Sequence, residues 1–512
     1  MLNWRIRYQK IVHRYPELTD PHLSVLEVGS EVQGIAELLQ RNITSVNGHI
    51  QATPSPWNTV VAGSPFKLPF ADNAFDHVVC ADGLKYIAKG ARALVIAEMT
   101  RVARRKVILS MPCANLAVQS DLALAAAFQR MGKGAPPWLH EGITRQLPTV
   151  AEMVQLVSGT GLRFEIHTNE TVLQHYGGLM LDIFFPFAAQ ISATEHSKMR
   201  HQSVPETGWE MYYSYLFCIF KEHDPAWQKV MPPPARKAAA TTPGVGLYAV
   251  YHRRLPLAPN TGITPIYVGE AAQAATETER SDTELDNSRW SELSGVHEVW
   301  KNGPRTAYVG FCHYRRFFDF SRKNGLARST TLSFNDYIAR AFVTASEHAI
   351  THFEKNPDTL IVPPTLEVGH NIWDQYALMH NANDLCMVTN LLVRSYPHLI
   401  PYLVESFSTR KLYANNLFIT RWDHFEELCA LWLDVLCEVE KNVPVRTEDP
   451  YQRRDLAFLA ERIFDIWVRY RAAQGTNLHA VPMLEITYPD LDTSAWSRTV
   501  PPSASAARGG RS

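Results

Sequence analysis

The residues best suited to chemistry are His313-Tyr314-Arg315-Arg316, which follow an aromatic and apolar run, Ala307–Cys312. A guanidinium group is planar, stays charged and can bind two phosphate oxygens at once, so two adjacent arginines suit a diphosphate. The histidine beside them can donate to a leaving phosphate or orient an acceptor. In open α/β sheets ligands bind outside the carboxyl ends of strands, where the expected strand delivers this run. An Arg-Arg pair alone also occurs at solvated strand ends, so the surrounding pattern has to decide.

A strand over Gly246–His252 and a helix that begins near Asp286-Asn287-Ser288 are expected to position this run. Asp and Ser side chains accept hydrogen bonds from the free N–H groups at a helix start. Trp290, Leu293 and Trp300 then repeat at helical spacing. The pattern therefore predicts an α/β domain with polar groups at one sheet edge.

Several motifs occur in order over residues 245–488. They are Asp286-Asn287-Ser288, Ser291-Glu292-Leu293, Trp300-Lys301-Asn302, Tyr308–Phe318, Leu360–Pro363, Asp374-Gln375-Tyr376, Tyr413–Ile419 and Arg453–Trp467. Together they resemble the domain, formerly of unknown function, of bacterial capsular and lipopolysaccharide synthesis proteins, which includes galactofuranosyltransferases. The resemblance implies a GT-A-like fold and transfer of a hexose, with galactofuranose a candidate, from a UDP-sugar to a glycan or lipid-linked glycan acceptor.

The same resemblance implies donor-binding residues. They are Asp286, Asn287, Glu292, His313, Tyr314, Arg315, Arg316, Asn415 and Asn416. An inverting transfer needs a base for the acceptor hydroxyl. Asp374 and Glu461 are the carboxylate candidates, His313 is a further catalytic candidate, and the sequence does not choose between them. Glu461 falls opposite its helix's apolar stripe, so it is either solvated or faces a pocket built by another segment.

No Asp-x-Asp motif follows an expected strand, and Asp319 near the arginines is a single carboxylate. The arginines can replace the charge of a divalent metal, so we expect no metal ligands and transfer that is independent of metal.

The N-terminal part begins with an apolar run, Leu23–Gly29, then a turn and a helix over Ile35–Leu39. This order opens a doubly wound nucleotide-binding sheet. Further strands are expected over His77–Ala81 and Lys106–Ser110. A final strand pair is expected over Arg163–His167 and Met211–Lys221.

Glu27-Val28-Gly29-Ser30, the run Leu68–Asp76 and the final strand pair resemble class I S-adenosylmethionine-dependent methyltransferases over residues 20–222. The resemblance implies a Rossmann-like sheet that binds S-adenosylmethionine. The implied cofactor-binding residues are Glu27, Gly29, Gly34 and Asp82. Glu31 stands where a second glycine is usual, and no acid ends the second strand near Val46-Asn47-Gly48. Two interpretations stay open, an active O-methyltransferase and a methyltransferase fold that no longer binds the cofactor.

A proline- and alanine-rich linker is expected over residues 224–244, where Pro232-Pro233-Pro234 lies. It separates a methyltransferase-like domain, residues 1–223, from a glycosyltransferase-like domain, residues 245–490. Residues 491–512 form a tail rich in Ser, Ala, Pro and Gly, for which disorder is expected.

The composition narrows the class of protein. A net charge of −1 without a basic stripe argues against a nucleic-acid partner. The start, Met1–Arg14, lacks the apolar core of a signal peptide, and Leu179–Ile191 is too short to span a bilayer. Seven scattered cysteines without a CxxC pair fit a reducing compartment. We expect a cytoplasmic protein, with any membrane contact peripheral, at the inner face and through a lipid-linked acceptor; the oligomeric state is not predicted.

The leading hypothesis is a glycosyltransferase for surface polysaccharide that carries an appended methyltransferase-like domain. The alternative is a S-adenosylmethionine-dependent O-methyltransferase of a glycan, whose C-terminal domain only binds glycan. A third hypothesis, of another class, makes both modules non-catalytic scaffolding.

Overall fold

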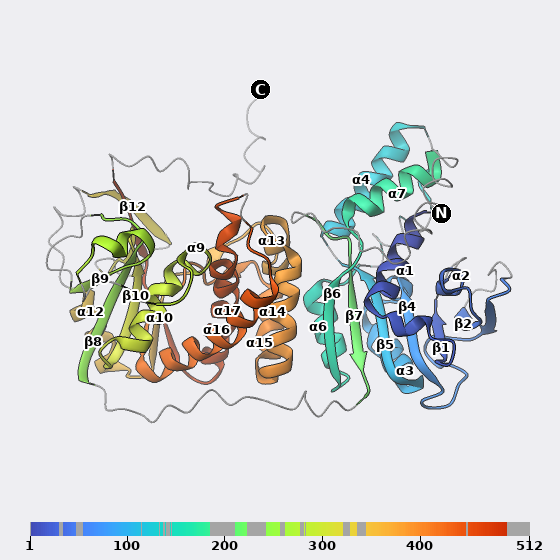
Figure 1. Ribbon diagram of the computed structural model, residues 1–512, viewed down its shortest axis with the longest axis horizontal. Helices are drawn as coiled ribbons and strands as arrows, with labels where there is room; N and C mark the ends of the chain where they lie inside the picture. The colour runs from blue at the N-terminus through green and yellow to red at the C-terminus, as the bar shows by residue number, and fades with distance from the viewer. Residues whose placement is uncertain are drawn as a thin grey trace, which may run out of the picture. The chain divides into compact units, whose positions relative to one another are not determined.

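The computed structural model describes residues 2–29, 34–47, 55–113, 115–132, 134–136, 139, 144, 146–184, 210–222, 242–255, 262–276, 281, 283–320, 328–334, 345–446 and 449–488. The chain divides into two units (Figure 1). Unit 1 comprises Met1–Val230 and Trp373–Ser408, and unit 2 comprises Met231–Ile372 and Thr409–Ser512. Most of the expected linker and all of the expected tail lie outside the described residues, although the first strand of unit 2 already begins at Thr242.

A seven-stranded sheet in the order β3-β2-β1-β4-β5-β7-β6 forms the centre of unit 1. Its strands are β1 (Val25–Val28), β2 (Ile43–Asn47), β3 (Asn58–Ala62), β4 (Phe75–Ala81), β5 (Ala103–Pro112), β6 (Arg163–Thr168) and β7 (Ser214–Phe220). β7 runs antiparallel between β5 and β6, whereas the pairs among β1 to β5 are parallel. Val25, Leu26 and Val28 are all buried, as expected for a parallel strand covered on both faces. The predicted Rossmann-like sheet and its final strand pair are confirmed.

The helices of unit 1 connect these strands. They are α1 (Leu2–Arg14), α2 (Ile35–Leu39), α3 (Arg92–Val102), α4 (Leu116–Arg130), α6 (Val150–Ser158) and α7 (Val172–Phe184), with the 3₁₀ turns η1 (Pro16–Thr19), η2 (Gly83–Tyr86) and η3 (Lys89–Ala91). A capping box in which Thr149 and Glu152 exchange hydrogen bonds fixes the start of α6.

A helical segment from later in the chain completes unit 1. It contains α13 (Ile372–Met379), α14 (Ala382–Ser395), η6 (Pro397–Leu399) and α15 (Ile400–Ser408). The side chain of Asn390 accepts from the backbone N–H of Ile166 in β6 at 2.8 Å and donates to its carbonyl at 2.9 Å. α14 therefore covers the edge strand β6, whose backbone groups would otherwise be unpaired. By chain order the sequence assigns this segment to the C-terminal domain, whereas the structure groups it with unit 1.

Unit 2 is built on a nine-stranded mixed sheet whose main path is β12-β18-β11-β10-β16-β13-β17. β8 pairs in parallel with β10 and with β9. The strands are β8 (Thr242–Tyr251), β9 (Ile263–Tyr267), β10 (Thr306–His313), β11 (Arg316–Phe318), β12 (Ser329–Ser333), β13 (Thr359–Val362), β16 (Phe418–Arg421), β17 (Asn477–Ala480) and β18 (Met483–Thr487), and β14 (Leu366–Glu367) with β15 (Lys411–Leu412) forms a separate pair.

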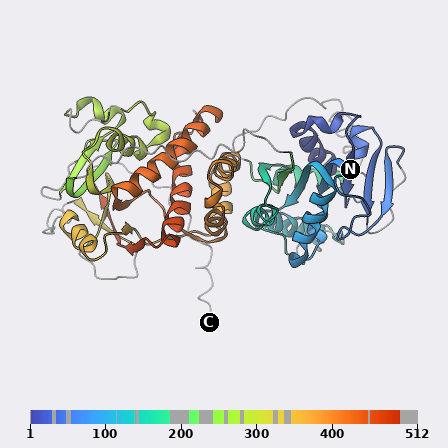
Figure 2. The ribbon, with the colours of Figure 1, turned by 90° about the horizontal axis from the view of Figure 1, so that it is seen from below.

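The helices of unit 2 are α9 (Asn287–Trp290), α10 (Glu292–Asn302), α12 (Ala345–Lys355), α16 (Trp422–Asn442) and α17 (Asp455–Ala473), with the 3₁₀ turns η5 (Gly269–Ala274) and η7 (Gln452–Arg454). α16 and α17 pack side by side and are the long orange and red helices in Figure 2. The apolar face of α16 is buried, including Phe425, Leu428 and Trp432, as its helical spacing predicts.

The mixed α/β fold class expected for both parts is confirmed. Among the described residues, none of the helices combines the length and the apolar composition that crossing a bilayer requires.

Candidate functional site

Three segments bring polar side chains to one edge of the sheet in unit 2. β8 and β10 are parallel, with Val250 opposite His313, so the residues after each strand emerge at the same edge. β16 runs antiparallel to β10, with Phe418 opposite Phe311, so the turn that precedes β16 lies at this edge too. His252-Arg253, His313–Arg316 and Asn415-Asn416 are thereby brought to one edge.

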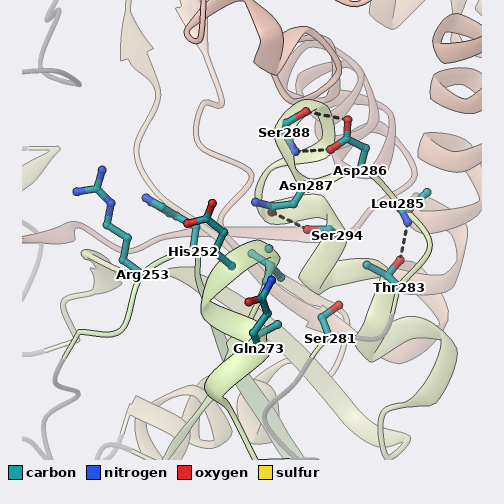
Figure 3. A pocket seen from close by; sticks show the side chains of 14 residues that line it. His252, Arg253, Gln273, Ser281, Thr283, Leu285, Asp286, Asn287, Ser288 and Ser294 are labelled. Atoms are coloured by element: carbon teal, nitrogen blue, oxygen red, sulfur yellow. Dashed lines mark hydrogen bonds between the residues drawn. The ribbon is translucent and has the colours of Figure 1, made fainter.

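A pocket of about 760 Å³ opens at this edge. Its lining is mostly polar and comes from the end of β8, from η5 and from the start of α9. The lining residues are His252, Arg253, Val268, Gly269, Glu270, Ala272, Gln273, Ser281, Thr283, Leu285, Asp286, Asn287, Ser288 and Ser294. Figure 3 shows Arg253 on one side of the pocket and Asp286 with Ser288 on the other.

Asp286 and Asn287, both predicted as donor-binding residues, line this pocket. Asp286 caps α9, since its carboxylate accepts from the Ser288 N–H at 2.9 Å and from the Ser288 hydroxyl at 2.7 Å. The Asn287 side-chain oxygen accepts from the Ser294 hydroxyl at 2.9 Å (Figure 3). These bonds hold the polar wall of the pocket in place.

Gly269 allows η5 to approach Asn287 closely. Its φ is +59°, and a Cβ atom added there would lie 2.9 Å from the Asn287 side-chain nitrogen. A side chain at this position is therefore both strained and crowded.

We expect Gly269→Ala to cost about 1–3 kcal/mol of stability and to weaken binding of UDP by about tenfold, because the added methyl group displaces Asn287. Isothermal titration with UDP and urea unfolding measure the two effects. Gly475→Ala is the matched control, since Gly475 has a φ of +95° with nothing within 4 Å of the added Cβ. An equal loss of UDP binding in both variants would contradict the assignment.

His313 lies at the centre of the cluster with Glu292 and Asn416. Its Nε2 atom is 4.0 Å from the Glu292 carboxylate, which also accepts from the Asn416 side chain at 2.9 Å. Among the described residues, Nε2 of the buried His313 has no hydrogen-bond partner. Burial, reinforced by the charge of Arg316 and then of Arg454, lowers the pKa of His313 well below its ordinary value. The imidazole is therefore neutral at neutral pH.

The arginines surround this histidine. Arg315 lies over the ring of Tyr314 at 5.5 Å, and the Tyr314 ring meets the His252 ring edge-on at 4.5 Å. Arg316 forms an ion pair with Glu485, with 3.4 Å between its Nε atom and the carboxylate oxygen. His252 is exposed to solvent, but the protein groups around its ring remove part of the water that would stabilise the charged form. Together with the charges of Arg253, Arg454 and Arg315, this desolvation lowers the pKa of His252 to about 4.

Three further residues of this edge, His252, Arg253 and Arg454, are not among those that the sequence predicts for the site. Arg454 lies 3.8 Å from the Glu292 carboxylate and donates to the Ser291 hydroxyl at 2.9 Å. The sequence does contain a signal that could have identified His252 and Arg253. They follow a buried strand directly, as the predicted His313–Arg316 run does. Arg454 joins the cluster only through contacts with residues far away in the chain.

Beside the cluster, three non-glycine residues have a positive φ angle. They are Ser291, with φ of 48°, Asn415, with φ of 78°, and Asn416, with φ of 49°. Such conformations cost energy and concentrate at functional sites. The Asn415 N–H donates to the Glu461 carboxylate at 2.9 Å, so Glu461 faces this turn rather than solvent alone.

Asp374, the other carboxylate candidate, is placed differently. It lies in the first turn of α13 in unit 1, where it is buried and accepts a hydrogen bond from the Asn115 side chain. The structure thus brings together the remaining predicted donor and catalytic residues in unit 2 and groups Asp374 with unit 1. Among the described residues, no set of three or more His, Cys, Asp or Glu side chains is arranged to hold a metal ion.

In unit 1, the predicted cofactor-binding residues Glu27, Gly29 and Gly34 lie around the end of β1. Gly29 has a φ of +79° and donates its N–H to the Val46 carbonyl at 3.0 Å. The Glu27 carboxylate accepts from the Ile35 N–H at 2.9 Å and from the Tyr8 hydroxyl. Burial raises the pKa of Glu27 to about 7. A Cβ at Gly34 would lie 1.9 Å from this carboxylate, so glycine is what makes room for it.

Asp82, the fourth predicted cofactor-binding residue, directly follows β4 and has a φ of 64°. Its carboxylate is paired with Arg7, whose guanidinium also pairs with Glu170 at 2.8 Å. Of the departures, Glu31 lies outside the described residues, whereas the second strand ends at Asn47 without an acid, as the sequence indicates. In this arrangement the acidic groups available for a cofactor, Glu27 and Asp82, are already paired within the chain. The described residues therefore do not fit S-adenosylmethionine without rearrangement.

His175 is the second cation of this buried cluster. Its Nε2 lies 3.2 Å from Asp121 and its Nδ1 lies 3.6 Å from Glu170, while its ring stacks on Tyr213 at 3.5 Å. Burial opposes protonation, but the hydrogen bonds and charges of Asp121 and Glu170 prevail and raise the pKa of His175. The raised pKa favours the protonated ring, whose charge offsets the charges of these two buried carboxylates.

Because the folded-state pKa of His175 is raised, its contribution to stability is full below the ordinary histidine pKa. It is lost as the pH rises through the folded pKa. We therefore expect the urea midpoint of unit 1 to fall as the pH rises above the ordinary histidine pKa of about 6.5, and this fall to disappear in His175→Gln. Tryptophan fluorescence followed across this range measures it. His398→Gln, which removes a histidine whose pKa is lowered, should keep the fall; a fall of equal size in His175→Gln would contradict the role.

Comparisons with known proteins agree with both sequence resemblances. Residues 246–472 match the family model described as "Domain of unknown function (DUF4422)", and residues 27–111 match the model described as "Methyltransferase domain". The N-terminal region of the chain thus matches a methyltransferase domain, and its C-terminal region matches the DUF4422 domain. No curated protein matches the chain.

Solved structures also match parts of the chain. The apo structure of the WbbM bifunctional glycosyltransferase is 21% identical, with a TM-score of 0.43, over 49% of this chain and 48% of that protein. The magnesium protoporphyrin IX methyltransferase (ChlM) from Synechocystis PCC 6803, solved with bound SAH, is 14% identical, with a TM-score of 0.26, over 43% of this chain and 86% of that one. The plantazolicin methyltransferase BpumL, also solved with SAH, is 11% identical, with a TM-score of 0.29, over 43% and 84%. This chain therefore spans about half the length of WbbM.

Proposed function

We propose that unit 2 transfers a hexose from a UDP-sugar to a hydroxyl of a growing surface glycan, with galactofuranose a candidate sugar. The observation that carries the proposal is the edge where the charges of Arg316, Arg454 and Arg315 act on the neutral, buried His313, beside a polar pocket that Arg253 lines. Guanidinium groups bind diphosphate oxygens bidentately and need no metal to supply charge.

The pocket suits the nucleotide part of such a donor. Asp286, Asn287, Ser288 and Thr283 present hydroxyl, amide and carboxylate groups that pair with ribose hydroxyls and the edge of a base. The diphosphate then reaches Arg253 and Arg315, and the sugar reaches the turn at Asn415-Asn416. Nucleotide, diphosphate and sugar are thus placed along the polar residues that extend from η5 and α9 to the start of β16.

His313 is proposed to hold the leaving phosphate. A neutral imidazole can donate one N–H, and Nε2 is available because it has no hydrogen-bond partner among the described residues. Arg315, which the diphosphate is proposed to reach, is one of the arginines that lower the pKa of His313, and a bound diphosphate would neutralise its charge. Donor binding would therefore raise the pKa of His313 and favour its role as a proton donor to the departing diphosphate.

The proton acceptor for the acceptor hydroxyl is proposed to be Glu461, with Glu292 the competing candidate. Both carboxylates contact the Asn415-Asn416 turn, whereas that of Asp374 is bonded to Asn115 in unit 1. Glu461→Gln and Glu292→Gln discriminate between them, since loss of the base lowers kcat more than it raises KM.

Methyl transfer to the same class of glycan is the second candidate function, favoured by the methyltransferase match over residues 27–111. It would let one chain extend a glycan and methylate it. The alternative, in which methyl transfer is the only activity and unit 2 only binds glycan, predicts no turnover of any nucleotide sugar.

A donor panel with the full chain tests the proposal. UDP-galactofuranose, UDP-galactopyranose, UDP-glucose and GDP-mannose are offered, with and without added Mn²⁺, and release of nucleotide is measured. Faster release from one UDP-sugar on addition of a glycan acceptor supports the proposal. No release and no thermal shift with any UDP-sugar would overturn it, and a strict requirement for Mn²⁺ would overturn metal independence.

A further inference from the structure

Helix α1 places two neighbouring side chains on the acidic residues of the methyltransferase unit. Arg7 donates to Glu170 from Nε at 3.1 Å and from Nη2 at 2.8 Å, and it also pairs with Asp82. Tyr8 donates its hydroxyl to Glu27. Two of the four residues that the sequence assigns to the cofactor are thus engaged by one turn of α1.

The Arg7 contact lies at the edge where this fold binds ligands. Asp82 directly follows β4, and Glu170 follows β6, so both carboxylates emerge at the carboxyl edge of the unit 1 sheet. Arg7, Asp82 and Glu170 are all buried. The guanidinium therefore occupies the place where a positively charged ligand would meet two carboxylates.

The pairing leaves hydrogen-bonding capacity unused. Among the described residues, Oδ1 of Asp82 and Oδ1 of Asn169 are buried without a hydrogen-bond partner. Asn169 lies beside Glu170, and its side chain donates to Ser110 at the end of β5. A buried acceptor without a donor is costly, so this arrangement is incomplete in a way that a ligand with N–H or O–H groups would repair.

We propose that Arg7 is an internal competitor in the methyltransferase unit, and that α1 must withdraw Arg7 from Asp82 and Glu170 before a cationic ligand binds there. S-adenosylmethionine carries positive charge on its sulfonium and ammonium groups, which makes it a ligand of the required kind. The proposal rests on the methyl-transfer part of the proposed function and explains why the described residues do not fit the cofactor as they stand. The contact between Arg7 and the two carboxylates is then autoinhibitory.

Removing the competitor tests the proposal. Isothermal titration of the full chain with S-adenosylmethionine compares the wild type, Arg7→Met and Arg14→Met. Arg14 lies on the same helix and is exposed, so Arg14→Met changes the net charge equally without touching the contact. We expect Arg7→Met to bind at least about tenfold more tightly than the other two. Equal or weaker binding by Arg7→Met, or no binding by any of the three, overturns the proposal.

A second measurement guards against misfolding, because Arg7→Met leaves two carboxylates buried. Arg7→Met/Glu170→Gln restores the charge balance and should bind more tightly than Glu170→Gln alone. In the wild type, S-adenosylmethionine should speed hydrogen exchange of the α1 amides by at least about threefold. Slowed or unchanged exchange overturns the proposal. The thermal response to UDP-sugars in the same sample reports on unit 2 and separates this outcome from a failure of glycosyl transfer.

Discussion

We expect Arg315→Met to lower kcat/KM for the proposed UDP-sugar donor by about a hundredfold while the fold remains intact. A charge-assisted hydrogen bond to a phosphate oxygen contributes about 1.5–3 kcal/mol, which corresponds to a factor of this size. Among the described residues the Arg315 side chain makes only its contact with the Tyr314 ring, so its loss should cost little stability. Initial rates of nucleotide release measure the effect.

Lys301→Met is the matched control for Arg315→Met. Lys301 is exposed near the end of α10, and its replacement removes one positive charge from unit 2 outside the cluster. We expect it to change kcat/KM by less than about twofold, because exposed charges are screened. Equal losses in the two variants would mean that net charge, rather than a phosphate contact, explains the effect.

Arg289→Met should lower the stability of unit 2 by about 3 kcal/mol, since the buried Asp455 loses two charge-assisted hydrogen bonds and, of its ion pairs among the described residues, keeps only the 3.3 Å pair with Arg446. Arg289 donates to the Asp455 carboxylate at 3.1 Å and 2.7 Å, and both residues are buried. The pair ties α9, which carries the pocket residue Asn287, to the start of α17. Urea unfolding measures the loss, and UDP binding should weaken with it.

Arg421→Met provides the comparison. Arg421 pairs with Asp423 at 2.5 Å, but both side chains are exposed, at 41% and 57%. Pairs of this kind contribute about 0–1 kcal/mol, so the variant should stay within that range. If Arg289→Met were no more destabilising than Arg421→Met, the α9–α17 pair would not hold the pocket wall.

Much of the architecture could be predicted because local patterns encode it. The apolar run Leu23–Gly29, the following turn and the helix over Ile35–Leu39 are contiguous in the sequence, and the structure forms β1 and α2 there. Part of the candidate site could be predicted from local patterns in the same way. His313–Arg316 follows a recognisable strand, and Asp286-Asn287 is a recognisable cap.

The remainder depends on contacts that no local pattern records. Arg454 reaches Ser291 across 163 positions in the chain. From the sequence, Arg7 belongs to the polar face of an amphipathic helix, where solvent exposure would be expected. In the structure it donates to Glu170, which is also 163 positions away. Asp374 was assigned by its order among motifs, whereas its neighbourhood is set by the packing of α14 against β6.

The covering of β6 by α14 means that the two units are interleaved in synthesis order. Unit 1 cannot finish folding until the ribosome has made residue 408, by which time much of unit 2 has already emerged. A fragment that stops before α13 would expose the β6 edge and the face of Tyr215, which meets Trp373 at 5.6 Å. A fragment that begins at β8 would carry α13 to α15 without their partner strand. The two proposed activities are therefore best assayed in one intact chain, because neither unit can be cut out as a contiguous segment without exposing an unpaired strand edge or an apolar surface.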